Sequence, residues 1–501
     1  MALSNRRSVM AIMKESTEGT PVFPSAATDY IAIQDGFSME PGIQTLENKE
    51  LRSSLGKAKP ILGIEQPKAS FDHYIRHSGV EGTAPNYSNL LEAAFGTKTV
   101  AGTAYNTTTG STTSVMHMAT GTGVNFQRGQ AMLIKDGTNG YSIRPVLSVA
   151  TDNVTLGFNV SSAPATGIST GKAVMFSPAD SGHPSLTISN YRANGGALEV
   201  VSGGRVTDFS IDFTAGDLIA GKFSVEGVAY YFDPVTITSS TRYLDFTDNA
   251  ATRAAVVTAK TYKDPLDFAS AVETSMNSLG SSNTFTVSYS STTGLYTVTS
   301  TGTTLSLLFN TGTNAANAMA TKLGFSAASD RTGALTYTST SVISFAAPNT
   351  PSYDNADPLV AKDNEVIIGD AGAGVVLKPS KVSVKFTPAR TQLKDVTATS
   401  GVSGSLITHR EAKITFTAFL DQYDADKFKR FRANDNTQFL YNFGVKTGGN
   451  WVAGKCGCVF VPSATISSFK LNDDNGLVTL ECELSAYVDS SGNGEIYLNF
   501  I

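Results

Sequence analysis

The chain has 501 residues, of which 41% are hydrophobic and 9% aromatic, a composition typical of folded globular proteins and unlike that of disordered chains. Its formal net charge of −5 argues against tight nucleic-acid binding, because an acidic surface repels phosphate. No apolar run approaches the roughly 20 residues of a membrane span, and "VMAIM" at the start is too short for an export signal, so we expect a protein kept in the cytosol.

Strand and turn patterns dominate the sequence. Forty-five glycines and Ser/Thr runs such as "NTTTGSTTS" indicate short strands joined by tight turns. Apolar and polar residues alternate in 206–213, 381–386 and 413–418, and again in 494–501, so the chain is expected to end inside a sheet. The sequence therefore predicts a mainly β fold.

The segment 42–67, "GIQTLENKELRSSLGKAKPILGIEQP", is β-like at both ends and densely charged in the middle, although only 16% of the chain is charged. We expect a long hairpin. Its charged residues are Glu47, Lys49, Glu50, Arg52, Lys57 and Lys59. Two interpretations stay open for these side chains, an assembly contact and a solvated, flexible hairpin.

Two helices are expected outside the inserted modules described below. "PNYSNLLEAAFG" at 85–96 has apolar residues at helical spacing and Gly96 where a C-terminal cap belongs. In 424–435, Phe428 and Phe431 continue a face from Leu420 and Tyr423, and the basic residues at its C-terminal end favour a solvated helix face over a binding patch.

Residues 112–182 read as a small β-barrel or sandwich. Asp136-Gly137 and Asn139-Gly140 are strong hairpin signals. Residues 262–338 read as an α-β-β-α unit. In that unit Asp264 caps a first helix, a hairpin follows, and "TNAANAMATKLG" at 313–324 is predicted to form a second helix that stops at Gly324.

The remaining pieces share a strand-rich composition and are interpreted as one sandwich interrupted twice, since surface loops tolerate large insertions. The expected division is 1–111 for the first part of the sandwich, 112–182 for a small β insertion, 183–240 for the second part, 241–344 for the α-β-β-α insertion and 345–501 for the third part.

Catalytic and cofactor motifs are expected to be absent. "GDLIAGKF" has phosphate-loop spacing, but Phe223 stands where a hydroxyl must hold magnesium. His73 and His77 share one face of a strand, for which a sheet surface or subunit contact is favoured over a metal site. Cys482 is expected in the core, and Cys456 and Cys458 do not have zinc-knuckle spacing. We therefore expect no enzyme activity, no cofactor and no metal.

Residues 14–96 resemble the major tail tube proteins of long-tailed, non-contractile bacteriophages. The likeness lies in "KESTEGTP", the charged hairpin, the "GTAP" turn and the "LLEAAFG" helix, and it continues in 185–227. The module 262–338 is similar to one that recurs in phage structural proteins. The two insertions depart from a minimal tube subunit, so their own roles do not follow from the resemblance.

The resemblance implies a virion protein, assembled in the host cytoplasm, whose hexameric rings of β-sandwiches stack into a hollow tube. Its implied partners are further copies of itself, the tail terminator, tape measure and tail tip proteins, and genomic DNA that passes through without tight binding, with no membrane partner. The charged hairpin would reach the neighbouring ring, and the insertions would decorate the outside. A receptor-binding or tail fibre protein is the alternative, and a β-rich glycan-degrading enzyme is a third.

Overall fold

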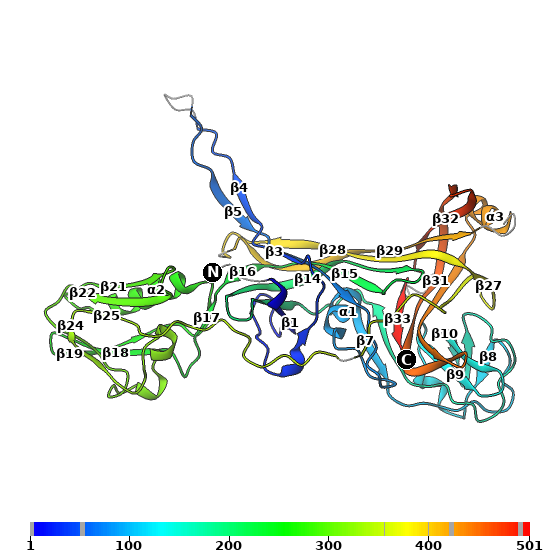
Figure 1. The fold of residues 1–501 in the computed structure, drawn as a ribbon, viewed down its shortest axis with the longest axis horizontal. Coiled ribbons are helices and arrows are strands. Elements are labelled where there is room, and N and C mark those ends of the chain that lie inside the picture. Colours follow the sequence, from blue (N-terminus) through cyan, green and yellow to red (C-terminus); the bar gives the residue numbers. More distant parts are fainter. Residues whose placement is uncertain (1–4, 51–55, 355, 399, 420–424, 489–493) are drawn as a thin grey trace.

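The computed structural model describes residues 5–50, 56–354, 356–398, 400–419, 425–488 and 494–501. The fold is mainly β, as predicted, with three α-helices among these residues. The molecule is elongated: a layered β body occupies the centre, a small β unit lies at one end, a second unit projects from the other end, and a long hairpin rises from the body (Figure 1).

The first layer of the body is an antiparallel sheet in the order β3-β6-β15-β14-β28-β29-β32-β31. Its strands are β3 (Ser38–Glu40), β6 (Lys68–Tyr74), β15 (Ala220–Glu226), β14 (Ala197–Thr214), β28 (Pro379–Lys394), β29 (Val402–Phe419), β32 (Leu477–Ala486) and β31 (Asn450–Asp474). In the predicted segments 206–213, 381–386 and 413–418 of the central strands, buried apolar residues alternate with more exposed polar ones.

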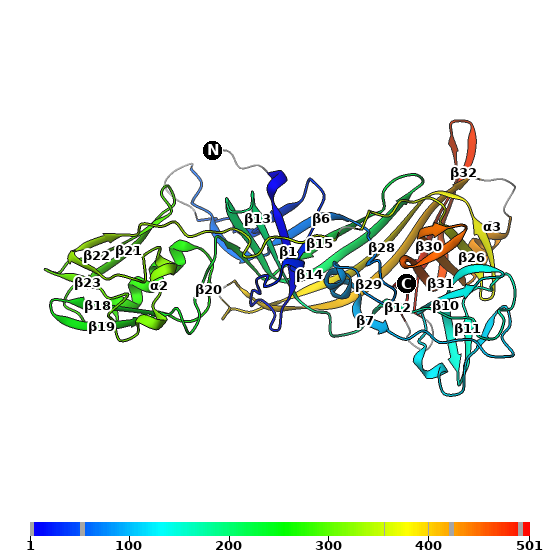
Figure 2. The same cartoon turned by 60° about the horizontal axis from the view of Figure 1, so that its bottom comes forward.

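Two further sheets cover this layer. One runs β27-β26-β30-β31-β33-β12-β7, and the other β2-β1-β13-β14-β16. Their bounds are β27 (Ala373–Leu377), β26 (Glu365–Asp370), β30 (Thr437–Thr447), β33 (Tyr497–Phe500), β12 (Ala173–Pro178), β7 (Gly96–Ala101), β2 (Tyr30–Ile31), β1 (Val9–Lys14), β13 (Leu186–Arg192) and β16 (Ala229–Phe232). The long strands β14 and β31 each continue from one sheet into another, which joins the layers (Figure 2).

Helix α1 (Ser88–Phe95) lies in the core of the body, where the ring of Phe95 stacks on Phe386 with 4.8 Å between centroids. The helix ends at Gly96 as predicted. Gly96 has φ +101°, and a Cβ there would come within 2.9 Å of Ala179 and His183, so glycine is required by backbone conformation and by space.

The small β unit consists of β8 (Val115–His117), β11 (Asn153–Leu156), β10 (Gly140–Ala150) and β9 (Ala131–Asp136), with a 3-10 turn at Gly123–Asn125. The predicted hairpin at 136–140 is confirmed: the Asp136 carboxylate accepts backbone hydrogen bonds from Thr138 and Asn139. β12, the last strand of the segment 112–182, lies in the body sheet between β7 and β33.

The projecting unit has its own hydrophobic core, formed by residues between Val235 and Tyr337. Its elements are β17 (Val235–Thr236), β18 (Tyr243–Asp248), β19 (Ala251–Val256), β20 (Thr261–Tyr262), α2 (Pro265–Asn277), β21 (Phe285–Ser290), β22 (Leu295–Ser300), β23 (Leu305–Leu307), β24 (Arg331–Ala334) and β25 (Thr336–Thr338). The predicted cap of α2 is confirmed, because the Asp264 carboxylate accepts from the Asp267 backbone N–H at 2.7 Å.

The second helix predicted at 313–324 is wrong. The segment forms two 3-10 turns, Ala315–Asn317 and Ala320–Leu323, separated by an extended Ala318. The backbone N–H of Met319 donates to the carbonyl of Tyr243 at 2.8 Å, and the Asp245 carboxylate accepts from the backbone and side chain of Asn314. These bonds to β18 replace helical hydrogen bonds, since each backbone N–H is satisfied once.

The helix predicted at 424–435 is present as α3 (Ala425–Ala433), while Leu420 and Tyr423 lie outside the described residues. Phe428 and Phe431 pack against Phe469 of β31. The solvated face predicted for its basic residues is wrong in part, because Lys427 is buried and Arg430 makes two 2.7 Å bonds to Asp370.

Candidate assembly interface

The charged segment 42–67 forms a two-stranded antiparallel hairpin of β4 (Ile43–Leu46) and β5 (Ile61–Glu65), hereafter the finger. It leaves the body between β3 and β6, the edge pair of the first sheet, and stands clear of the rest of the chain (Figure 1). Two strands alone are only marginally stable in water, so an isolated ribbon of this kind is expected to be completed by contacts elsewhere.

The charged side chains gather near the tip of the finger. Glu47, Lys49, Glu50, Lys57 and Lys59 are exposed, and Arg52 lies outside the described residues. The structure brings Glu47 and Lys57 to 3.6 Å from each other. Because both side chains are more than half exposed, this ion pair adds little stability to the finger.

The finger also exposes aliphatic side chains, whereas the prediction from the sequence named only its charged residues. Their exposed fractions are 46% for Ile43, 46% for Leu46, 58% for Ile61 and 68% for Leu62. Leu46 is paired with Ile61 on one face, whereas Leu62 is paired with Thr45 on the other, so both faces are partly apolar. The run "ILGIE" indicates this apolar exposure in the sequence, because an apolar strand beside a charged loop has no polar face to present to water.

The base of the finger is anchored firmly. Glu65 accepts a 2.6 Å hydrogen bond from the backbone N–H of Tyr230 and forms an ion pair with Lys263 of the projecting unit. Gly42 has φ +58°, and a Cβ there would lie 1.8 Å from the carbonyl oxygen of Gln66. These contacts fix the direction in which the finger leaves the body.

The solvent face of the first sheet is a second candidate surface. On β14 the side chains of Asp208, Ser210 and Asp212 alternate with the buried Phe209 and Ile211. Four lysines on this face are paired with carboxylates: Lys222 with Asp212 at 3.0 Å, Lys385 with Asp208 at 3.0 Å, Lys413 with Glu411 at 2.8 Å and Lys68 with Glu226 at 3.2 Å. These surface pairs add little stability, but each one offsets a positive charge that a phosphate would otherwise meet.

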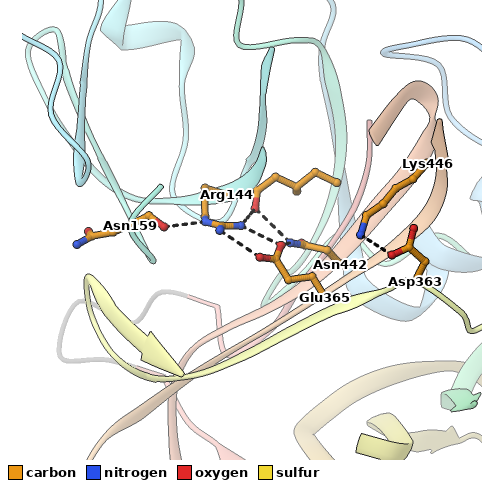
Figure 3. A network of polar contacts seen from close by, with 7 residues as sticks. Arg144, Asn159, Asp363, Glu365, Asn442 and Lys446 are labelled. Carbon is orange, nitrogen blue, oxygen red and sulfur yellow. Dashed lines mark hydrogen bonds and ion pairs between the residues drawn. The ribbon is translucent and has the colours of Figure 1, made fainter. Parts of the chain in front are cut away.

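A buried polar network fixes the small β unit to the body (Figure 3). The guanidinium of Arg144 on β10 makes two bonds to the Glu365 carboxylate of β26, at 3.0 and 3.2 Å, and donates to the carbonyl of Asn159. Asn442 of β30 donates to the same carboxylate at 2.7 Å. Paired, bidentate geometry of this kind is strong and directional.

His73 and His77 are both buried, which corrects the expectation that they lie on a sheet surface or in a subunit contact. His73 is 1% exposed, its Nδ1 lies 2.6 Å from the carbonyl oxygen of Ala32, and its ring packs on Tyr87. Burial lowers the pKa of His73 to about 4 and also lowers the pKa of His77. Tyr87, at the start of α1, covers the ring of His73.

The cysteines are all buried. Cys482 lies in the main core as predicted, and burial raises the pKa of Cys456 to about 12. Thiols in this state are poor nucleophiles. Within the described residues, His, Cys, Asp and Glu side chains form no group of three that could hold a metal ion.

Comparison with solved structures finds a likeness to a tail tube. The chain resembles the SPP1 tail tube, solved by solid-state NMR and cryo-electron microscopy, with 15% sequence identity and a TM-score of 0.20, over 29% of this chain and 80% of that one. At this TM-score the likeness carries no argument about function. No family model and no curated protein sequence matches the chain. Each helix within the described residues is too short or too polar to cross a bilayer.

Proposed function

We propose that this chain is a structural subunit of a phage tail tube, which assembles with copies of itself into stacked hexameric rings around a hollow passage. The observation that supports the proposal best is the finger. It is anchored at its base, separated from the body, and bears aliphatic side chains on both faces together with a charged tip. Such a surface is costly to leave in water and suits burial between copies.

The charge-paired sheet face suits the passage. DNA that moves through a tube must meet a polar wall that does not hold it, and lysines already paired with carboxylates contribute little to phosphate binding. Rings would expose this face to the lumen and carry the projecting unit outside. The proposal includes no catalytic role, no cofactor and no membrane partner. The tail terminator, tape measure and tail tip proteins are its proposed partners in the virion.

Electron microscopy of the purified protein tests the proposal. We expect six-fold rings or hollow tubes from the full chain, and a folded but non-stacking protein when residues 48–58 are deleted. Tubes of normal length from the deletion variant would refute the role of the finger. A protein that stays monomeric at high concentration with the finger intact would refute the tube itself.

A receptor-binding or fibre protein is the second candidate, and the projecting unit favours it, because a module with its own core at one end of the molecule is suited to bind a separate partner. Copy number in the virion separates the two functions. A tube subunit is present in many tens of copies, and a tip fibre in a few.

A further inference from the structure

A second isolated hairpin stands at the opposite edge of the sheet from which the finger grows. β29 pairs with β32 as far as Thr479, and beyond Asn472 the described strands β31 and β32 run on as a two-stranded ribbon with a turn at Asn475-Gly476. The sheet order places β3 and β6 at one edge and β31 at the other, so the finger and this ribbon, the distal hairpin of residues 470–480, are separated by the width of the sheet (Figures 1 and 2).

The distal hairpin exposes aliphatic side chains as the finger does. Leu471 is 50% exposed, Leu477 57% and Val478 52%. Val478 is paired with Asp473 and Leu477 with Asp474, so neighbouring positions place apolar atoms on both faces. Helix α3 covers Phe469, and β29 supports β32 as far as Thr479. Beyond Asn472 the two described strands have two exposed faces and a partly apolar surface, as the finger has.

The charges of the two ribbons are complementary. Between residues 47 and 59 the described part of the finger carries the exposed Lys49, Lys57 and Lys59 beside Glu47 and Glu50, an excess of one positive charge. The distal hairpin carries the exposed Asp473 and Asp474 at its turn and Lys470 at its base, an excess of one negative charge. Lysines opposite carboxylates set the register of a contact and speed its formation, while burial of the aliphatic groups supplies most of its free energy.

One chain cannot bring these ribbons together, since they stand at opposite edges of its own sheet. Two copies placed edge to edge can, because the finger of one then lies beside the distal hairpin of the next. A contact between two different surfaces repeats from copy to copy, and it generates closed rings or helical stacks.

We propose that the finger of one copy docks against the distal hairpin of a second copy, with Leu46, Ile61 and Leu62 covering Leu471, Leu477 and Val478. The lysines of the finger face Asp473 and Asp474 in this contact. The inference rests on the proposed self-assembly and names the surface that receives the finger.

Disulfide trapping tests the contact directly, because the natural cysteines are buried and leave introduced surface thiols as the reactive ones. Leu62→Cys and Leu477→Cys are made in separate chains, mixed, assembled and oxidised. We expect a cross-linked dimer from the mixture and none from either variant alone. The matched control replaces Leu477→Cys by Val124→Cys on the small β unit, where the side chain is 78% exposed, and should give no dimer.

Charge reversal provides the second arm. Lys57→Glu with Lys59→Glu in the finger, and Asp473→Lys with Asp474→Lys in the hairpin, should each raise the concentration needed for assembly by about tenfold, and the two sets combined should restore it. The inference is overturned if the wild type assembles but the cysteine mixture gives no cross-linked dimer and the combined charge reversals do not restore assembly. That outcome would leave the proposed tube intact. Failure of the wild type to assemble would overturn the proposed function itself.

Discussion

The small β unit and the projecting unit are both inserted into the body, yet they are attached in different ways. The small unit shares a core with the body: Leu133, Ile143 and Phe158 pack with Phe460 and Tyr497 of the body sheet. The projecting unit closes a core of its own and reaches the body through a few contacts, among them the ion pair of Lys263 with Glu65. An insertion that shares a core has become part of the fold, whereas one with a separate core stays a module.

Deletion of each unit gives the largest expected contrast. Replacing 106–169 by a short Gly-Ser linker should abolish folding of the body, because it bares the apolar side chains packed beneath the unit and removes the Ala131 N–H and Gly129 carbonyl that bond the buried Asn499 carboxamide. Replacing 239–340 in the same way should leave the body folded, since the removed core is separate.

Circular dichroism and thermal unfolding of the two deletion variants measure this contrast. A cooperative transition is expected from the second variant alone. If the variant without 106–169 also unfolds cooperatively near the wild-type temperature, the shared core is not needed and the comparison fails.

Acid should separate the two regions as well. The pKa of His73 in the body is about 4, below the ordinary value near 6.5 in an unfolded chain, so the unfolded state binds the proton more tightly. The resulting stability is present above pH 6.5 and is lost as the pH falls through 6.5 towards 4, by up to about 3 kcal/mol. The projecting unit contains no histidine and should be spared this loss.

Urea unfolding followed between pH 7 and pH 4.5 tests the linkage. His73→Gln should flatten the pH dependence of the body, and His409→Gln, at an exposed position, should not. Equal slopes in wild type and His73→Gln would show that other groups cause the acid loss.

The polar network between the small unit and the body is expected to have a smaller effect. Arg144→Ala leaves the Glu365 carboxylate without its bidentate partner and should lower the free energy of unfolding by about 3 kcal/mol. Lys446→Ala removes a pair whose Asp363 is 70% exposed and should cost under about 1 kcal/mol. Denaturant midpoints measure both losses. Equal losses would show that the buried network stabilises the protein no more than the exposed pair does.

Sequence patterns predicted the parts of this fold that local chemistry decides. Gly96 ends α1, Asp264 begins α2, and the turn after Asp136 closes a hairpin, because each feature depends on neighbours within a few residues. The helix predicted at 313–324 failed since its hydrogen bonds go to the distant Tyr243 and Asp245.

The candidate interface was predictable only in part. The charges of the finger are visible as letters, but the exposure of Leu62 and the burial of His73 depend on what the rest of the chain covers. The edge positions of the finger and the distal hairpin depend on pairings between strands more than a hundred residues apart, such as β6 with β15 and β28 with β14. Periodicity along one strand carries no information about such partners.

The smallest expected effect on stability comes from the finger. Leu46→Ser with Ile61→Ser should change the free energy of unfolding of the monomer by no more than about 0.5 kcal/mol, because both side chains are already exposed. Assembly should nevertheless fail. Val124→Ser is the matched control, exposed in the monomer and outside the proposed contact. Normal assembly of the finger variant, measured by sedimentation, would contradict an interface there.

Cryo-electron microscopy of the assembled full-length protein tests the central claim most directly. The account predicts a hollow tube of repeated copies in which each finger lies against the distal hairpin of another chain and the charge-paired sheet face lines the passage. A solitary subunit whose finger folds back on its own body, or a tube in which the finger stays free in solvent, would contradict it.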